Sequence, residues 1–289
     1  MLSRARRRTL SFGLQTILGL KKKGFFIPMR SAPAAETWAH RSYQAMAGVF
    51  SEAEPAFRDH LSRIDEFADD LAKLNGPPPE PRFNQTWFPR LDAAALYALV
   101  RHERPSRIVE VGSGHSTRFL VRAARDGGAP TQITAIDPAP RADIAGLPIE
   151  IHKKTVQEAG LAPFEGLASG DLLFVDSSHV LMPGTDVDLV LNHVVPALPA
   201  GVIVGFHDIF LPQPYPAAWP FTAYNEQNAV ASLLRGADLV FASAYAVARM
   251  AEFRESWIGQ QPLKEGARES LLLLRLREGH TTMRSHDLL

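Results

Sequence analysis

Cysteine is absent from this sequence of 289 residues. Disulfide bonds, thiolate metal ligands and cysteine nucleophiles are therefore excluded, so any catalytic base must be another side chain. Long apolar runs are missing too, since no stretch approaches the roughly 20 apolar residues that a helix needs to span a bilayer. We expect a cytoplasmic protein, and this composition is compatible with a reducing compartment.

The chain also lacks net charge, because 31 Lys and Arg residues balance 31 Asp and Glu residues. This balance gives no reason to expect a nucleic-acid partner. With 46% hydrophobic and 21% charged residues, the composition is that of an ordinary globular protein. The length allows one large domain with an extension, or two small domains.

Acidic residues are missing from Met1–Arg30, which contains eight basic residues. Four apolar residues between the basic clusters have helical spacing, although Gly13 and Gly19 weaken a helix there: Leu10, Leu14, Ile17 and Leu18. Three interpretations stay open for this basic amphipathic segment, 1–33. It is a solvated extension, a helix in peripheral contact with an anionic membrane surface, or an organelle-targeting peptide.

A second segment, 34–81, is predicted to be a helical extension followed by a Pro-rich linker. Apolar residues recur at three- and four-residue steps through Ala34–Asn75, and Pro55 marks a break between two helices. The linker is Gly76–Pro81, with the sequence GPPPEP. The helical part could pack over a site or against a second copy of the chain, so a homo-oligomer is one option.

From 82 to 289 the pattern changes to alternating strands and helices. This alternation predicts an α/β fold with a doubly wound, mostly parallel seven-stranded sheet and helices on both faces. We predict strands at 107–111, 132–136, 149–152, 171–175, 201–206, 238–242 and 270–276, and helices at 91–103, 116–125, 156–161, 187–195 and 225–234.

The first strand leads into a glycine-rich turn within Arg107–Thr117, RIVEVGSGHST. In an open α/β sheet such a turn lies where ligands bind. Gly112 permits a sharp turn, and Gly114 lets the backbone approach a ligand closely. A dinucleotide site would need a third glycine where Thr117 stands, and an acid such as Glu110 suits a ligand's amino group better than a pyrophosphate.

The second predicted strand ends at Asp137, where a carboxylate can accept hydrogen bonds from ribose hydroxyls. Acids at strand ends also cap turns or helices, so a purely structural role for Glu110 and Asp137 is the alternative. Together, framing a glycine turn at this spacing, they favour a bound nucleoside. The predicted cofactor-binding residues are Glu110, Gly112, Ser113, Gly114, Ser116, Thr117, Asp137 and Asp176.

These motifs resemble those of the class I, Rossmann-like, S-adenosylmethionine-dependent methyltransferases. The resemblance covers roughly Trp87 to Leu276. Within this superfamily the chain looks like the branch that contains the catechol-type and macrolide-sugar O-methyltransferases. It is carried by EVGSGHST, ITAIDP, DLLFVDSSH, GVIVGFHDI and the segment Tyr224–Gln227. It implies that 82–289 binds S-adenosylmethionine and methylates a hydroxyl of a small molecule or saccharide. Ser116 replaces the usual third glycine of the family motif.

Four side chains are expected to converge over the cofactor, since neighbouring strands end only about 5 Å apart. Asp176 ends the fourth strand, His179 follows it, and His207 and Asp208 end the fifth. A hydroxyl acceptor must lose its proton. Either a positioned base takes this proton, or a metal ion lowers the pKa of the hydroxyl. Two options therefore stay open: His207 or His179 as base with an Asp partner, or a divalent metal on Asp176, His207 and Asp208.

The identity of such a metal is open as well. Catechol-type relatives hold magnesium with an acid and an Asp-Asn pair, whereas this chain has His207-Asp208 at that position. Magnesium prefers oxygen ligands, while imidazole suits manganese, iron or zinc. Asp186 and Asp188 are instead expected in the first turn of a helix, where acidic side chains interact favourably with the helix dipole. Tyr224 is assigned to the acceptor pocket, and Ile209–Phe221 to a substrate lid.

Two other functions compete with methyl transfer. The chain could be a non-catalytic, membrane-associated module that binds the cofactor or a partner. It could also be a nicotinamide-dependent oxidoreductase, which Thr117 and Glu110 disfavour.

Overall fold

The computed structural model describes residues 4–279 apart from 26, 37, 129 and 218–223. Contacts divide the chain into two compact units, Met1–Arg41 and Ser42–Leu289. The helices between Gln44 and Leu71, which the sequence analysis placed in a separate extension, belong to the larger unit. The predicted lid, 209–221, lies partly outside the described residues.

The smaller unit contains two helices, α1 (Arg4–Ile17) and α2 (Ala32–Glu36). Leu10, Leu14 and Ile17, whose spacing is helical, lie in α1, despite Gly13 inside this helix. None of the helices in the described ranges is long and apolar enough to cross a membrane.

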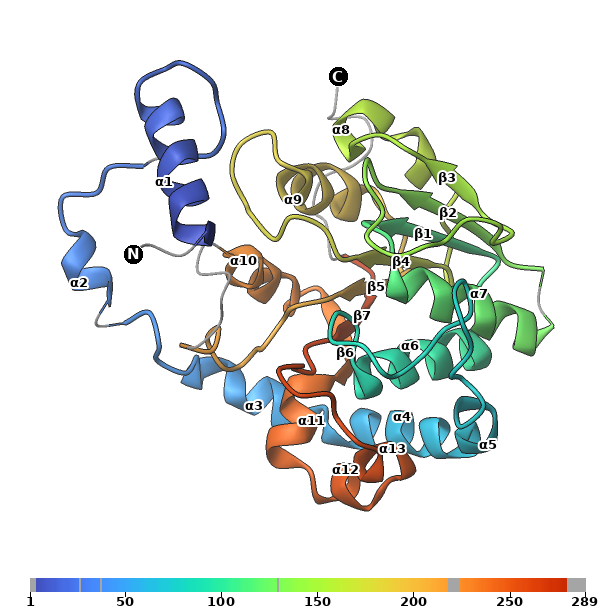
Figure 1. Cartoon of the computed structure of the whole chain (residues 1–289). Helices are drawn as coiled ribbons and strands as arrows, with labels where there is room; N and C mark the ends of the chain where they lie inside the picture. The colour runs from blue at the N-terminus through green and yellow to red at the C-terminus, as the bar shows by residue number, and fades with distance from the viewer. Residues whose placement is uncertain (1–3, 26, 37, 129, 218–223, 280–289) are drawn as a thin grey trace. The chain divides into compact units, whose positions relative to one another are not determined.

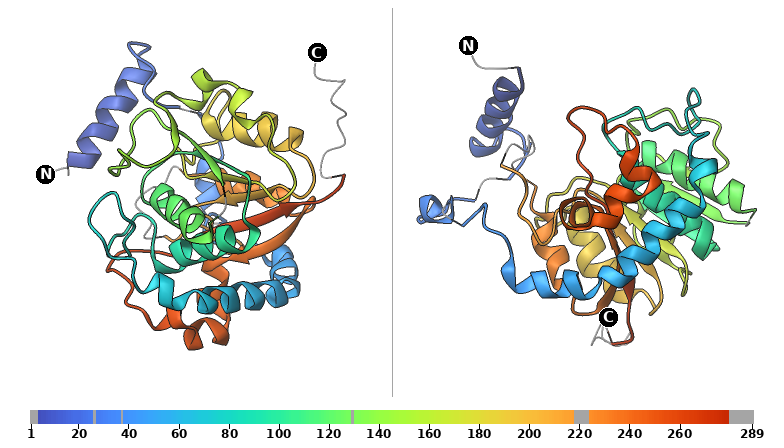
Figure 2. Two further views of the ribbon diagram at one scale, coloured as in Figure 1. Left: turned by 90° about the vertical axis from the view of Figure 1, so that its right-hand side faces the viewer. Right: turned by 90° about the horizontal axis from the view of Figure 1, so that it is seen from below.

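The larger unit is built on a seven-stranded sheet with the order β3-β2-β1-β4-β5-β7-β6 (Figure 1). The strands run in parallel except β7, which pairs antiparallel with β5 and β6 and is red in Figure 2. This confirms the predicted mostly parallel sheet. The strands are β1 (Arg107–Val111), β2 (Gln132–Ile136), β3 (Glu150–His152), β4 (Leu172–Val175), β5 (Ile203–Phe206), β6 (Ala237–Ala242) and β7 (Leu272–Leu276).

Helices cover both faces of this sheet (Figure 1). Helices α4, α6 and α7 lie on one face, and α8 and α9 lie on the other. The helices are α3 (Gln44–Glu52), α4 (Glu54–Glu66), α5 (Ala68–Leu71), α6 (Arg90–Glu103), α7 (His115–Gly127), α8 (Val156–Ala159), α9 (Asp186–Leu189), α10 (Glu226–Leu233), α11 (Ser243–Arg249), α12 (Ala251–Glu255) and α13 (Trp257–Gln260).

Local sequence explains most of these elements. All four residues of β4 and of β5 are buried, as expected for apolar central strands of a parallel sheet covered on both faces. Pro55 lies in the first turn of α4, which confirms the predicted break. The predicted helix at 187–195 is less regular, because α9 continues as a π-helical turn, Val190–Val194, and a 3₁₀ turn, Val195–Ala197, where Pro196 removes a backbone donor.

Helices α11 to α13 were not predicted. They are short, and α12 and α13 pack against α4, far away in the sequence (Figures 1 and 2). Arg58 of α4 binds Glu252 at 2.5 Å, and Asp65 accepts a hydrogen bond from the Trp257 amide at 2.9 Å. Such long-range contacts stabilise helices that are too short to form from local propensity.

Candidate active site

The glycine turn lies where β1 ends, between β2 and β4 at the centre of the sheet. Gly112 has φ +83°, and a Cβ there would overlap the carbonyl oxygen of Asp176. Only glycine combines this backbone conformation with such close packing. The turn therefore brings the ends of β1 and β4 together, which is the edge where ligands bind in open α/β sheets.

Glu110 supports this turn from behind. Its side chain is fully buried, and its two carboxylate oxygens accept hydrogen bonds from the hydroxyls of Ser116, at 2.6 Å, and Thr117, at 2.5 Å. Thr117 Oγ1 also accepts a hydrogen bond from the Gly114 amide at 2.9 Å. Burial raises the pKa of Glu110 to about 8, against the effect of the two hydroxyls. Through these contacts with Ser116 and Thr117, Glu110 holds the first turn of α7 in place.

Asp137 stands at the edge of a cavity of about 500 Å³. Its carboxylate accepts hydrogen bonds from the amides of Ser113 and Ala139, both at 2.7 Å. The cavity wall also contains Gly112 and Asp176, so it extends across the ends of β2, β1 and β4. The predicted cofactor residues Gly112, Ser113, Asp137 and Asp176 thus line one cavity.

A second cavity, of about 420 Å³, adjoins the first and shares Ser113, Arg141 and Asp176 with it. Its wall includes Trp87, which is half exposed, with the Arg141 guanidinium 4.8 Å from its ring centre. Gly114 and three further predicted residues line it as well: Ser116, His179 and Tyr224. The two cavities form one site with two chambers that meet at Asp176.

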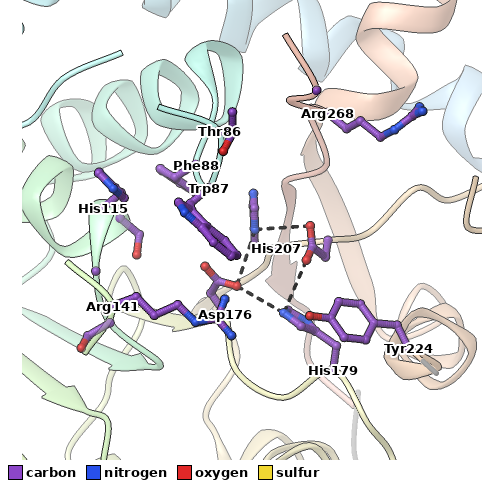
Figure 3. A pocket seen from close by; sticks show the side chains of 15 residues that line it. Thr86, Trp87, Phe88, His115, Arg141, Asp176, His179, His207, Tyr224 and Arg268 are labelled. Carbon is purple, nitrogen blue, oxygen red and sulfur yellow. Dashed lines mark ion pairs between the residues drawn. The ribbon is translucent and has the colours of Figure 1, made fainter. Parts of the chain in front are cut away.

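Four side chains meet at the floor of the second cavity (Figure 3). His179 Nε2 lies 3.3 Å from Asp176 Oδ1 and 3.5 Å from Asp208 Oδ2. His207 Nδ1 lies 3.6 Å from both Asp176 Oδ1 and Asp208 Oδ1. All four predicted catalytic and metal residues are therefore brought together.

Each histidine is fixed by a second, fully buried carboxylate on its outer nitrogen. His179 Nδ1 lies 2.8 Å from Glu226 Oε2, and His207 Nε2 lies 3.1 Å from Asp92 Oδ2. A carboxylate that binds the outer nitrogen orients the imidazole and leaves its inner nitrogen free to act as a ligand or a base. The arrangement is typical of histidines that hold metal ions.

The backbone is strained at two residues of this cluster. His179 and Asp208 both have φ +58°, and of the described residues other than glycine only Arg104 shares a positive φ. Left-handed backbone costs free energy for such residues and is concentrated at functional sites. The fold therefore holds these two side chains toward one point at some cost to stability.

The charges in the cluster are strongly coupled. Burial opposes protonation of His179, but hydrogen bonds to Asp176 and Glu226 outweigh it and raise its pKa to about 10. Burial likewise opposes protonation of His207, yet the carboxylates of Asp176 and Asp208 raise its pKa well above the usual value. Burial alone would raise the pKa of Asp176, but the two histidines hold it well below its usual range. Positive charge is thus stabilised at the centre.

The donor set suits a divalent cation. Ligand atoms of Asp176, His179 and Asp208 lie within 4.8 Å of one another, so His179 completes this group with the two acids. His207, which the sequence analysis assigned to the metal, is not part of the group, although its Nδ1 lies 3.6 Å from both carboxylates. Mixed imidazole and carboxylate donors suit manganese, iron or zinc better than magnesium.

Sequence reasoning missed three residues of the site. Glu226 lies in the segment Tyr224–Gln227, whose pattern was noticed without assigning it a role. Asp92 is in the first turn of α6, where an acidic residue is expected simply because it interacts favourably with the helix dipole. Trp87 precedes α6 and carries no local signal of a pocket. Asp186 accepts hydrogen bonds from Ser178 and also lines the first cavity, while Asp188 caps the turn before α9.

A doubly wound sheet with a two-chambered site at the ends of β1 and β4 defines a Rossmann-like ligand-binding protein. Residues 109–209 match the family model described as a methyltransferase domain. This part of the chain is thus similar to a methyltransferase domain, in agreement with the resemblance of the motifs around Glu110 and Asp176. No curated protein matches the chain.

Solved structures show only distant likeness. The SAH-bound methyltransferase PaMTH1 of Podospora anserina is 16% identical, with a TM-score of 0.41, and the match covers 88% of this chain and 100% of that one. The O-methyltransferase TomG of Streptomyces achromogenes, in complex with SAM, is 16% identical, with a TM-score of 0.37 and coverage of 75% and 90%. MycE, a methyltransferase of the mycinamycin pathway in complex with Mg and SAH, is 12% identical, with a TM-score of 0.40 and coverage of 74% and 54%. Identities and TM-scores this low carry no information about the function of this chain.

Proposed function

We propose that this chain transfers the methyl group of S-adenosylmethionine to a hydroxyl of a small-molecule or saccharide acceptor. One observation carries the proposal: the chamber lined by Asp137 and the chamber floored by the histidine–aspartate cluster meet at Asp176. A methyl donor in the first chamber and an acceptor in the second would face each other there.

The first chamber fits the nucleoside part of the donor. The Asp137 carboxylate is held by two amides, so it can accept hydrogen bonds from ribose hydroxyls without rearrangement. The start of α7, with Gly114 and Ser116, lines the second chamber, and the positive end of the helix dipole would favour the carboxylate of the methyl donor there. Glu110 contributes indirectly, because it fixes the first turn of α7 through Ser116 and Thr117.

The cluster fits a divalent cation, and Asp176, His179, His207 and Asp208 would hold it. Such an ion would lower the pKa of an acceptor hydroxyl and position its oxygen. The buried carboxylates of Glu226 and Asp92 support this fit, since both outer histidine nitrogens are already paired.

Methyl transfer is an in-line displacement, so the protein must align the acceptor oxygen with the methyl carbon and take up the hydroxyl proton. We assign the hydroxyl proton to His179 when it is not a ligand. A cation on Asp176 and Asp208 would displace the proton that these carboxylates hold on His179, so that its Nε2, which faces the second chamber, could accept one while Nδ1 stays bound to Glu226. His207 is enclosed behind it, with its ring 5.0 Å from Phe88, and acts as a ligand or orienting group. Both histidines are 3% exposed, so bulk solvent has little access to them at this floor.

The acceptor chamber is walled by aromatic rings. The Tyr224 ring lies 4.4 Å from that of His179, tilted by 39°, and Trp87 lines the same chamber. Flat rings of this kind suit phenolic or sugar acceptors. Within the described part of the predicted lid, Tyr215 packs against Phe210 and Tyr224 beside this wall.

Calorimetric titration with S-adenosylhomocysteine tests the proposal on protein stripped with a chelator, with and without added Mn²⁺. We expect binding in both conditions, and a metal requirement only for turnover with an acceptor. No binding in either condition would overturn the proposal. Binding of NADH instead would favour the nicotinamide-dependent oxidoreductase, whereas binding of S-adenosylhomocysteine without methylation of any phenol or glycoside would favour a non-catalytic module.

A further inference from the structure

Large apolar side chains are exposed mainly in one short stretch of the chain. Of the fourteen that are exposed among the described residues, ten lie between positions 10 and 38. Isolated exposed apolar residues are ordinary, but a concentration of this kind marks an interaction surface. The ten are Leu10, Phe12, Leu14, Ile17, Leu18, Leu20, Phe25, Ile27, Met29 and Trp38.

Positive charge is concentrated in the same stretch. Eight of the 31 basic residues lie in Met1–Arg30 and none of the 31 acidic residues does, so the rest of the chain is net acidic. The body of the protein is therefore repelled by an anionic surface, whereas this segment is attracted to it.

The cationic and apolar groups alternate in space as well as in sequence. After α1 the chain turns back, and the Lys23 amide donates to Thr16 Oγ1 at 3.0 Å. The turn brings Lys23 Nζ to 5.5 Å from the centre of the Phe12 ring, while Lys22 Nζ lies 4.7 Å from that of Phe25. Aromatic rings beside lysines are characteristic of the boundary between lipid headgroups and acyl chains, where the charged ends reach the phosphates.

We infer that the segment 4–38 docks on the surface of an anionic lipid bilayer. Apolar residues would enter the headgroup boundary, and the lysines would bind lipid phosphates. The 14 residues of α1 are too few to span a bilayer, so the helix would lie on it. A second copy of the chain is a poorer occupant, because it would bring two acid-free basic segments together. A polynucleotide offers no environment for Leu14, Ile17 and Leu18.

Co-sedimentation of the full chain with vesicles tests this inference. Phosphatidylglycerol–phosphatidylcholine vesicles are compared with vesicles of phosphatidylcholine alone, at low and high salt. We expect binding to the anionic vesicles that weakens with salt. The triple substitution Lys21→Gln, Lys22→Gln and Lys23→Gln should weaken binding on the order of 100-fold, since each charge contributes roughly a fivefold factor.

Apolar insertion is tested separately with Leu14→Glu and Ile17→Glu. The matched control is Leu161→Glu with Leu263→Glu, two exposed apolar residues of the larger unit. The first pair should abolish vesicle binding and the control should retain it, while S-adenosylhomocysteine affinity reports that all variants are folded. Equal binding by both pairs, or equal binding to neutral and anionic vesicles, would overturn the inference. A dimer without vesicles that Leu14→Glu dissociates would overturn it too, in favour of self-association.

Discussion

Asp92 of α6 accepts a hydrogen bond from His207 Nε2 at 3.1 Å, although 115 positions separate them in the sequence. The Asp92 carboxylate also accepts the amides of Ser270, at 2.9 Å, and Leu271, at 3.1 Å, so its orientation is fixed. It thereby holds a proton on Nε2 of His207 and directs Nδ1 toward Asp176 and Asp208, where a cation would displace the second proton of the ring. Asp92 is a positioning residue for the proposed cation.

The substitution Asp92→Asn should weaken Mn²⁺ binding by roughly 10- to 100-fold. Asn can still accept the two backbone amides, but its NH₂ group then faces Nε2 and favours the opposite tautomer of His207. Calorimetric titration with Mn²⁺ measures the effect.

Asp171→Asn is the matched control, because Asp171 is equally buried and accepts two amides, at the opposite end of β4. Equal loss of Mn²⁺ affinity in both variants would show that Asp92 acts only through stability.

His179→Ala should lower methyl transfer by about 10²- to 10⁴-fold, the usual contribution of a positioned base. S-adenosylhomocysteine affinity should change little, because His179 does not line the Asp137 chamber. Turnover is measured with the first phenol or glycoside that the wild-type protein methylates. His193→Ala, at an exposed histidine of the same domain, should leave turnover unchanged. Full turnover of His179→Ala would show that His179 has no part in the mechanism.

Much of this site could be predicted from sequence because it lies at strand ends. Apolar runs mark β4 and β5, and the polar residue that follows each one falls on the same edge of the sheet. That geometry is sufficient to bring Asp176, His207 and Asp208 together without knowledge of the loops.

The supporting groups could not be predicted in this way. Asp92 and Glu226 lie on helices whose rotation and distance from the sheet are set by packing, which sequence periodicity does not specify. Glu110 was expected to meet an amino group, but its position inside the turn depends on the hydroxyls of Ser116 and Thr117. The direction of β7 depends on pairing with β5 and β6, and its apolar sequence fits either direction.

Asp137→Ala should weaken S-adenosylhomocysteine binding by roughly 10- to 100-fold, as expected for loss of one or two charge-assisted hydrogen bonds. The Ser113 and Ala139 amides also lose their acceptor, so the chamber wall loosens. Asp143→Ala is the control, since Asp143 is exposed and its carboxylate accepts a hydrogen bond from the nearby Ala145 amide. Titration of both variants with S-adenosylhomocysteine separates them, and equal affinities would contradict the nucleoside assignment.

Gly112→Ala should lower the free energy of unfolding by about 3 kcal/mol or more. The added Cβ meets the Asp176 carbonyl in a backbone conformation with φ +83°. Gly146→Ala has a similar φ of +79° but nothing within 4 Å, so it should cost only about 1 kcal/mol. Denaturant unfolding of the two variants separates the effect of the steric overlap with Asp176 from that of the backbone strain at positive φ. An equal loss of unfolding free energy in both variants would contradict the close contact between the ends of β1 and β4.

His60 should make the stability of the domain depend on pH. Its ring is 1% exposed, lies 4.7 Å from that of Phe241, and its Nε2 is paired with the Ala95 carbonyl at 3.0 Å. Burial lowers its pKa from 6.5 to about 4. Between these two values the unfolded chain binds a proton that the folded chain does not. The contribution of the neutral ring is therefore complete above pH 6.5 and is lost as pH falls toward 4, by about 3 kcal/mol in all.

The variant His60→Gln keeps a donor for Ala95 but cannot titrate in this range. Its unfolding free energy, compared with that of the wild type by urea denaturation, should therefore fall less steeply between pH 6.5 and pH 4. His193→Gln, at an exposed position, should follow the wild-type curve. Parallel curves for His60→Gln and the wild type would show that His60 is hydrated when folded, and would place solvent between α4 and the sheet.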